Sequence, residues 1–257
     1  MVKSAALLLL LPATSLVAQE APRYTVAGLR CAVFGLEIRS DIKSQRGRVT
    51  IQDRAGRDGV LAVRAKDTTG GLAIEAWFDS LAVWRRSRAG TEHGDPEGFL
   101  GGRYRGLLLP TGGYEPIAVP FVPDPLADLA DLRTALDDFF PLLADRPLEP
   151  GGVWRAEGIE IRRVADRDGF GQYRWRKSSR ASDSLTVEAG TARIEQQTTE
   201  TGQLSWSATL GPAAWYRRIE VNARLPRTES VSQGMLSEVL QEIWVTRRPE
   251  SPICDSH

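Results

Sequence analysis

The chain has 257 residues, and its 33 lysines and arginines balance 33 aspartates and glutamates, which gives a formal net charge of +0. This balance argues against nucleic-acid binding and against a polybasic protein of membrane surfaces. With 42% hydrophobic and 26% charged residues, the composition is that of a folded chain and not of a disordered one.

Histidine and cysteine are scarce, and this excludes several kinds of catalytic site. The sequence contains two histidines, His93 and His257, and two cysteines, Cys31 and Cys254. A zinc site of the histidine–cysteine type needs three or four ligands at motif spacing, and no G-x-S-x-G turn is present to hold a serine nucleophile. We therefore predict a protein that is not an enzyme and that uses no metal or cofactor.

Residues 1–18 have the features of a secretory signal peptide. Lys3 supplies the positive start, residues 5–11 form an apolar run, and mostly small residues follow up to Ala18. The run is shorter than the roughly 20 apolar residues that cross a bilayer, and no later stretch is apolar enough to do so. We expect an exported protein, periplasmic or extracellular, that is not integral to the membrane.

The two cysteines lie near opposite ends of the mature chain. Because an exported protein enters an oxidising compartment, Cys31 and Cys254 are candidates for a disulfide that ties the termini together. The alternative is a pair of unrelated thiols.

The first half of the chain shows the pattern of antiparallel strands. Apolar and polar residues alternate over 49–52, 61–66 and 72–79, which predicts strands with one buried face. Polar and glycine-containing stretches at 54–59 and 67–71 predict the turns between them.

A helix is predicted over residues 125–140. Asp124 is the expected N-cap, Pro125 suits the first turn, and Pro141 ends the pattern. Leucines and phenylalanines recur at helical spacing along one side, so this helix should lie against a sheet. The apolar positions are Leu126, Leu129, Leu132, Leu136, Phe139 and Phe140.

After residue 150 the alternation of strands returns, most clearly over 204–210 and 215–225. Residues 235–245 fit a helix or a strand, and their β-branched and aromatic residues favour a strand. The predicted fold class is mainly β (α+β), with long antiparallel strands forming a curved sheet or half-barrel packed on one helix, residues 125–140. Residues 19–257 would form one β-rich domain, or two halves (22–120 and 151–249) joined by a helical segment, 121–150.

An apolar ligand cavity between sheet and helix is the leading candidate site, because half-barrels of long strands enclose either a side-chain core or a lipid-sized space. The alternative is that the same residues only fill the core. The candidate ligand-binding residues are Trp77, Phe78, Trp206 and Trp215 from strands, with Leu129 and Leu136 from the helix.

Two further patterns are weaker. The basic, aromatic hairpin at 162–177 suits glycans, lipid head groups or single-stranded nucleic acid, but a solvated strand face explains it as well. Two pairs of carboxylates four residues apart, Glu75 with Asp79 and Glu238 with Glu242, could serve a glycosidase, but a solvated sheet face presents such pairs as well.

The order of strands, helix and strands, the N-terminal signal and the long one-faced strands resemble bacterial lipoprotein-carrier half-barrels of the LolA/LppX type. Residues 139–143 and 147–154 are similar to a strand-entry motif of uncharacterised exported bacterial proteins. The resemblance implies a curved antiparallel sheet around a helix, with an apolar ligand. The predicted function is therefore non-enzymatic binding of an apolar or amphiphilic, lipid-like ligand in the cell envelope. The alternative is an envelope module that binds a protein or a glycan without a ligand cavity.

Overall fold

A computed structural model of the chain describes residues 21–187, 190–226 and 234–249. The predicted signal peptide (1–18) and Cys254 lie outside the described residues, so the signal and the disulfide stay predictions. The described elements, in chain order, are α1 (Val26–Leu29), β1 (Ala32–Arg46), β2 (Val49–Thr68), β3 (Gly71–Ser87), β4 (Gly90–Gly94), β5 (Tyr104–Leu108), β6 (Tyr114–Ala118), α2 (Asp124–Ala127), β7 (Val153–Ala156), β8 (Ile159–Arg163), β9 (Gly171–Val187), β10 (Gly190–Ser207), β11 (Gly211–Leu225) and β12 (Met235–Arg247).

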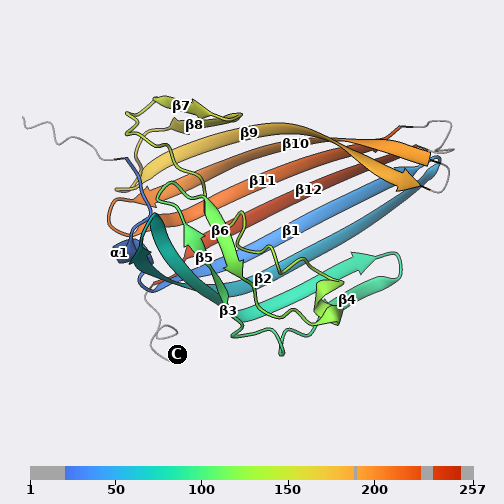
Figure 1. Cartoon of the computed structure of the whole chain (residues 1–257), viewed down its shortest axis with the longest axis horizontal. Helices are drawn as coiled ribbons and strands as arrows, with labels where there is room; N and C mark the ends of the chain where they lie inside the picture. Colours follow the sequence, from blue (N-terminus) through green and yellow to red (C-terminus); the bar gives the residue numbers. More distant parts are fainter. Residues whose placement is uncertain (1–20, 188–189, 227–233, 250–257) are drawn as a thin grey trace, which may run out of the picture.

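Twelve strands in the described part of the chain form one open antiparallel sheet (Figure 1). The order along the sheet is β6-β5-β3-β2-β1-β12-β11-β10-β9-β8-β7, and β4 pairs with β3 off this path. The first and last strands are neighbours: β1 pairs with β12 from Phe34 opposite Arg247 to Arg46 opposite Met235. The prediction of a mainly β fold built on long antiparallel strands is thus confirmed, and residues 235–247 are a strand.

One face of the sheet, here called the inner face, carries the main hydrophobic core. The connection between β6 and β7 crosses this face (Figure 1). Alternation along the strands directs one set of apolar side chains inward, and these residues are buried. They include Phe34, Leu36, Ile38, Leu61, Val63, Ile74, Phe78, Leu204, Trp206 and Trp215.

The turn predicted at residues 54–59 is wrong, because β2 continues through it as a single strand of 20 residues. The two glycines of this stretch serve packing and not chain reversal. A side chain on Gly56 would meet the indole of Trp84 at 2.6 Å, and one on Gly59 would meet the carbonyl oxygen of Ser80 at 2.7 Å. Glycine inside a strand thus marks a close approach of a neighbour.

The helix predicted over 125–140 is also wrong in its extent. Only α2, four residues long, is helical, and the rest of the stretch consists of turns and irregular structure. Asp124 is the first residue of α2 and not its N-cap, which is Pro123 without a side-chain hydrogen bond. The predicted apolar stripe is nevertheless buried against the sheet, with Leu126, Leu132 and Leu136 each 1% exposed.

Two physical features explain why no long helix forms. The carboxylate of Asp131 accepts from the backbone N–H groups of Arg133 and Thr134, which starts a new turn and competes with helix continuation. Side chains of the sheet also donate to carbonyl oxygens that a helix would have used internally. These bonds run from Arg57 to Asp131, from Tyr104 to Leu132 and from Arg217 to Asp138.

Candidate functional site

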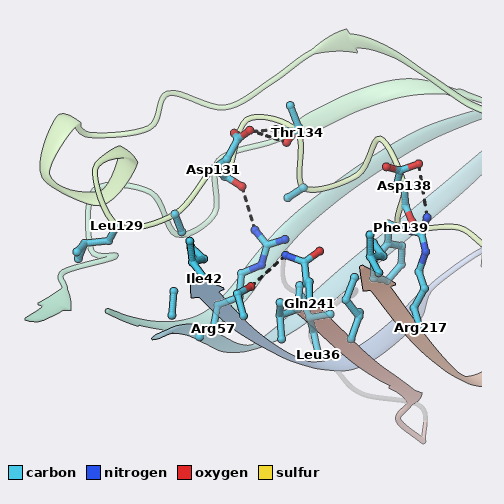
Figure 2. A pocket seen from close by; sticks show the side chains of 18 of the residues that line it. Leu36, Ile42, Arg57, Leu129, Asp131, Thr134, Asp138, Phe139, Arg217 and Gln241 are labelled. Carbon is cyan, nitrogen blue, oxygen red and sulfur yellow. Dashed lines mark hydrogen bonds and ion pairs between the residues drawn. The ribbon is translucent and has the colours of Figure 1, made fainter. Parts of the chain in front are cut away.

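A cavity of about 390 Å³ lies between the inner face and residues 129–139, which are here called the covering segment (Figure 2). Four adjacent strands in the middle of the sheet, β2, β1, β12 and β11, provide its floor. The cavity is of the size that ligand sites usually have, about 300–1,000 Å³.

Most of the cavity lining is aliphatic or aromatic. The strands contribute alternate residues, because successive side chains point to opposite faces of the sheet. The covering segment adds small and apolar side chains from above. The apolar lining residues are Leu36, Ile38, Ile42, Ala55, Leu129, Ala130, Ala135, Phe139, Trp215, Ile219 and Ile243.

Arg57 crosses the cavity from the floor towards the covering segment (Figure 2). Its Nη1 donates to the backbone oxygen of Asp131 over 3.0 Å. Its Nε is inaccessible and has no hydrogen-bond partner. Burial lowers the pKa of Arg57, and the charges of Tyr104 and Asp131 oppose this shift.

A second arginine, Arg217 on β11, also lines the cavity and is ion-paired with Glu200. Its Nε donates to Glu200 over 2.7 Å, and its Nη1 donates to the backbone oxygen of Asp138. Trp175 donates to the same Glu200 oxygen over 2.8 Å. Burial raises the pKa of Glu200, but the hydrogen bond and charge of Arg217, with the Trp175 bond, outweigh it and hold the pKa below its ordinary value.

The cavity adjoins an uncovered part of the inner face. Asp131, Thr134 and Asp138 are exposed at its rim. From Ile42, which lines the cavity, an apolar row continues across the sheet, because Ile42 pairs with Val239 and Val239 with Val221. All three are half-buried, so the floor extends beyond the covering segment as a partly exposed apolar strip.

The structure brings together two of the six candidate ligand-binding residues, Leu129 and Trp215, in the lining of this cavity. Phe78, Trp206 and Leu136 instead belong to the packed core. Trp77 lies in a separate small cluster with Val33, Val60 and Ala62, where the guanidinium of Arg103 stacks 3.7 Å from its ring centre.

The sequence prediction missed Arg57, Arg217 and Gln241. A usable signal was present for Arg217, because it lies between Trp215 and Ile219 on the strand face that is otherwise apolar. A charged residue in the apolar phase of a strand indicates a buried polar contact. Arg163, which follows Ile159 and Ile161 in the same phase, is 2% exposed and shows the same rule.

The other candidate sites are dispersed or paired. In the hairpin at 162–177, Arg174 and Arg176 are exposed while Tyr173 is buried and Lys177 lines a smaller cavity of about 220 Å³. Glu75 pairs with Arg105 at 3.2 Å. Among the described residues, no group of three or more histidines, cysteines and carboxylates could hold a metal ion, and no helix has the length and hydropathy to cross a membrane.

No protein-family model and no curated protein matches the sequence. Among solved structures, the chain is similar to one described as lipid–protein interactions in lipovitellin, with 12% identity and a TM-score of 0.47 over 86% of this chain. The chain spans only 26% of that lipovitellin chain. A complex of MucB with MucA(peri) matches at 9% identity and a TM-score of 0.12, covering 88% of this chain and 96% of that one. The functional conclusion therefore rests on the cavity and not on these similarities.

Proposed function

We propose that the protein is an exported, non-enzymatic binding protein for an apolar or amphiphilic, lipid-like ligand. The cavity of about 390 Å³ under the covering segment, with its aliphatic floor and arginine-containing lining, is the observation that carries this proposal. A bound acyl chain would lie on the floor formed by Leu36, Ile38 and Ile243. A longer chain would extend along the strip of Ile42, Val239 and Val221.

The driving force would be the removal of apolar surface from water. Each methylene group of a ligand that leaves water contributes about 0.8 kcal/mol. Part of this gain is offset by the loss of ligand freedom on binding. The cavity is partly open and has an apolar floor on which an acyl chain could lie, and the polar groups at its rim leave room for a head group in contact with water.

Filling the cavity should weaken ligand binding. Ala55 lies on β2 in the cavity lining, so the change Ala55→Phe places a ring where the ligand would lie. We expect the affinity for a fluorescent apolar probe such as 1-anilinonaphthalene-8-sulfonate or a fluorescent fatty acid to fall by tenfold or more. The measurement is a fluorescence titration of the mature protein.

The matched control is Ala73→Phe, which adds the same ring at an exposed position on β3 outside the cavity lining. This variant should bind the probe like the wild type. Mass spectrometry of organic extracts of the purified wild type should also detect a co-purified lipid that the Ala55→Phe variant lacks. If the Ala55→Phe variant bound the probe as tightly as the wild type and the control variant do, the proposed site would be wrong.

A further inference from the structure

We infer that the ligand is an anionic amphiphile, and that Arg57 binds its carboxylate or phosphate head. This inference rests on the proposed function and adds the chemical class of the ligand. It depends on the contacts of Arg57, on the contrast with Arg217 and on the polar groups that surround the two.

The positive charge of Arg57 has no carboxylate partner within ion-pair distance among the described residues. A guanidinium group has five N–H donors. In Arg57 one of them reaches the backbone oxygen of Asp131, a neutral acceptor, and Nε has no partner at all. Arg57 is half-buried and its Nε is inaccessible. Charges that are withdrawn from water are normally paired, so this arrangement leaves a cation in the cavity that an anion would satisfy.

The carboxylate of Asp131, whose backbone oxygen accepts from Arg57, is already used elsewhere. Oδ1 of Asp131 accepts from the backbone of Arg133 over 3.1 Å, and Oδ2 accepts from the hydroxyl of Thr134 over 2.9 Å. Figure 2 shows the carboxylate turned towards Thr134, while the backbone oxygen faces Arg57. The carboxylate of Asp131 thus holds the covering segment in its turn, and its charge acts on Arg57 without an ion pair between the two side chains.

Arg217 shows what a neutralised arginine looks like in the same cavity. It contacts Glu200 at 2.7 Å and the carboxylate of Asp138 at 3.7 Å. Asp138 is a rim residue whose side chain is 78% exposed, so water screens its repulsion of an incoming anion. Of the two arginines in the lining, Arg57 is the one with donors left for a ligand.

Neutral polar side chains beside Arg57 would complete a head-group site. Gln241 and Ser40 lie in the lining, where the amide of Gln241 donates to the hydroxyl of Ser40 over 3.3 Å. Apolar side chains, Leu36 and Ile42, flank them on β1. A site with one cation among neutral polar groups, next to an apolar floor, provides the contacts that a fatty-acid carboxylate or an alkyl phosphate requires.

The test uses three ligands with the same twelve-carbon tail: dodecanoate, dodecyl phosphate and dodecanol. Each displaces a fluorescent probe from the mature protein, below the micellar concentration of the ligand. For the wild type we expect at least one anionic ligand to bind about tenfold to a hundredfold more tightly than the alcohol. This is the gain in affinity that a charge-assisted hydrogen bond provides. Comparison of the two anions distinguishes a carboxylate from a phosphate head.

The change Arg57→Gln should remove the preference for the anion, so that the ratio of anion affinity to dodecanol affinity falls to about that expected for two neutral head groups. Arg57→Lys keeps the charge and should retain part of the preference. The matched control is Arg54→Gln on the same strand, where the exposed arginine pairs with Asp41 at 2.8 Å outside the cavity. That variant should behave like the wild type, and circular dichroism should show the same fold for all variants.

Three results would overturn the inference, and each is distinct. Equal binding of the anions and the alcohol by the wild type would show that the ligand class is wrong while the cavity still binds apolar tails. A preference for the anion that persists in Arg57→Gln would place the head group elsewhere. Failure of all three ligands to displace the probe would reject the proposed function itself, and the inference with it.

Discussion

Replacing Phe139 by alanine is expected to lower the free energy of unfolding by about 3–5 kcal/mol, the usual cost of removing a buried aromatic ring. Phe139 is 6% exposed and connects the covering segment to the sheet. Its ring centre lies 5.6 Å from that of Phe34 on β1 and 5.1 Å from that of Trp215 on β11. Removing the ring would therefore leave a void between the two layers that form the cavity.

Equilibrium unfolding in urea measures this effect. Phe121→Ala is the matched control, because Phe121 belongs to the same connection between β6 and β7 but is 77% exposed. We expect that variant to change stability by less than about 0.5 kcal/mol. If both variants had the same small effect, the covering segment would not be packed on the sheet, and the cavity would lose its upper wall.

The second large effect is expected for Glu200→Gln, which removes one partner of a buried ion pair. The side chains of Glu200 and Arg217 are 12% and 10% exposed. Breaking a buried pair by removing one charge costs about 3–5 kcal/mol because the other charge stays buried. Asp138 remains near Arg217, so we place the loss for Glu200→Gln near the lower end, at about 3 kcal/mol.

The double variant with Glu200→Met and Arg217→Met should recover most of this loss, because it leaves no buried charge. The matched control, Glu220→Gln, breaks the more exposed pair with Arg218 and should cost at most about 1 kcal/mol. Urea titrations at several pH values complete the test. Since the pKa of Glu200 is lowered in the folded protein, its stabilising contribution is present above its ordinary pKa of 4.5 and is lost as the pH falls through the folded value.

A Glu200→Gln variant as stable as the wild type at neutral pH would contradict the assignment of this pair. The assignment would also be contradicted if the difference in the free energy of unfolding between wild type and variant grew as the pH fell below 4.5.

Sequence periodicity predicted the strands well, because alternation directly reports which side chains a sheet buries. Leu72, Ile74, Ala76 and Phe78 were expected on one face, and all four are in the core. The pattern did not reveal whether glycines mark turns. Gly56 lies within β2, where its missing side chain makes room for Trp84 on the neighbouring strand, and such a contact depends on strand register and not on local sequence.

The helix and the site were harder to predict, for related reasons. The apolar spacing over 125–140 correctly identified buried residues such as Leu132 and Leu136, yet their burial does not require a helix. Donors on distant strands, including Arg57, take the backbone acceptors of this segment. Because the sequence does not show which arginine meets which carbonyl, it gave neither the turns of the covering segment nor the charged lining of the cavity.

The central claim is that an acyl chain lies between the inner face and the covering segment. Photo-crosslinking tests it most directly, with a fatty acid that carries a diazirine near the end of its chain and with the modified peptides mapped by mass spectrometry. The account predicts that labels fall on cavity residues of β1, β12 and the covering segment, and that excess unlabelled fatty acid suppresses them. Labels confined to the opposite face of the sheet, or labels that excess ligand does not suppress, would contradict it.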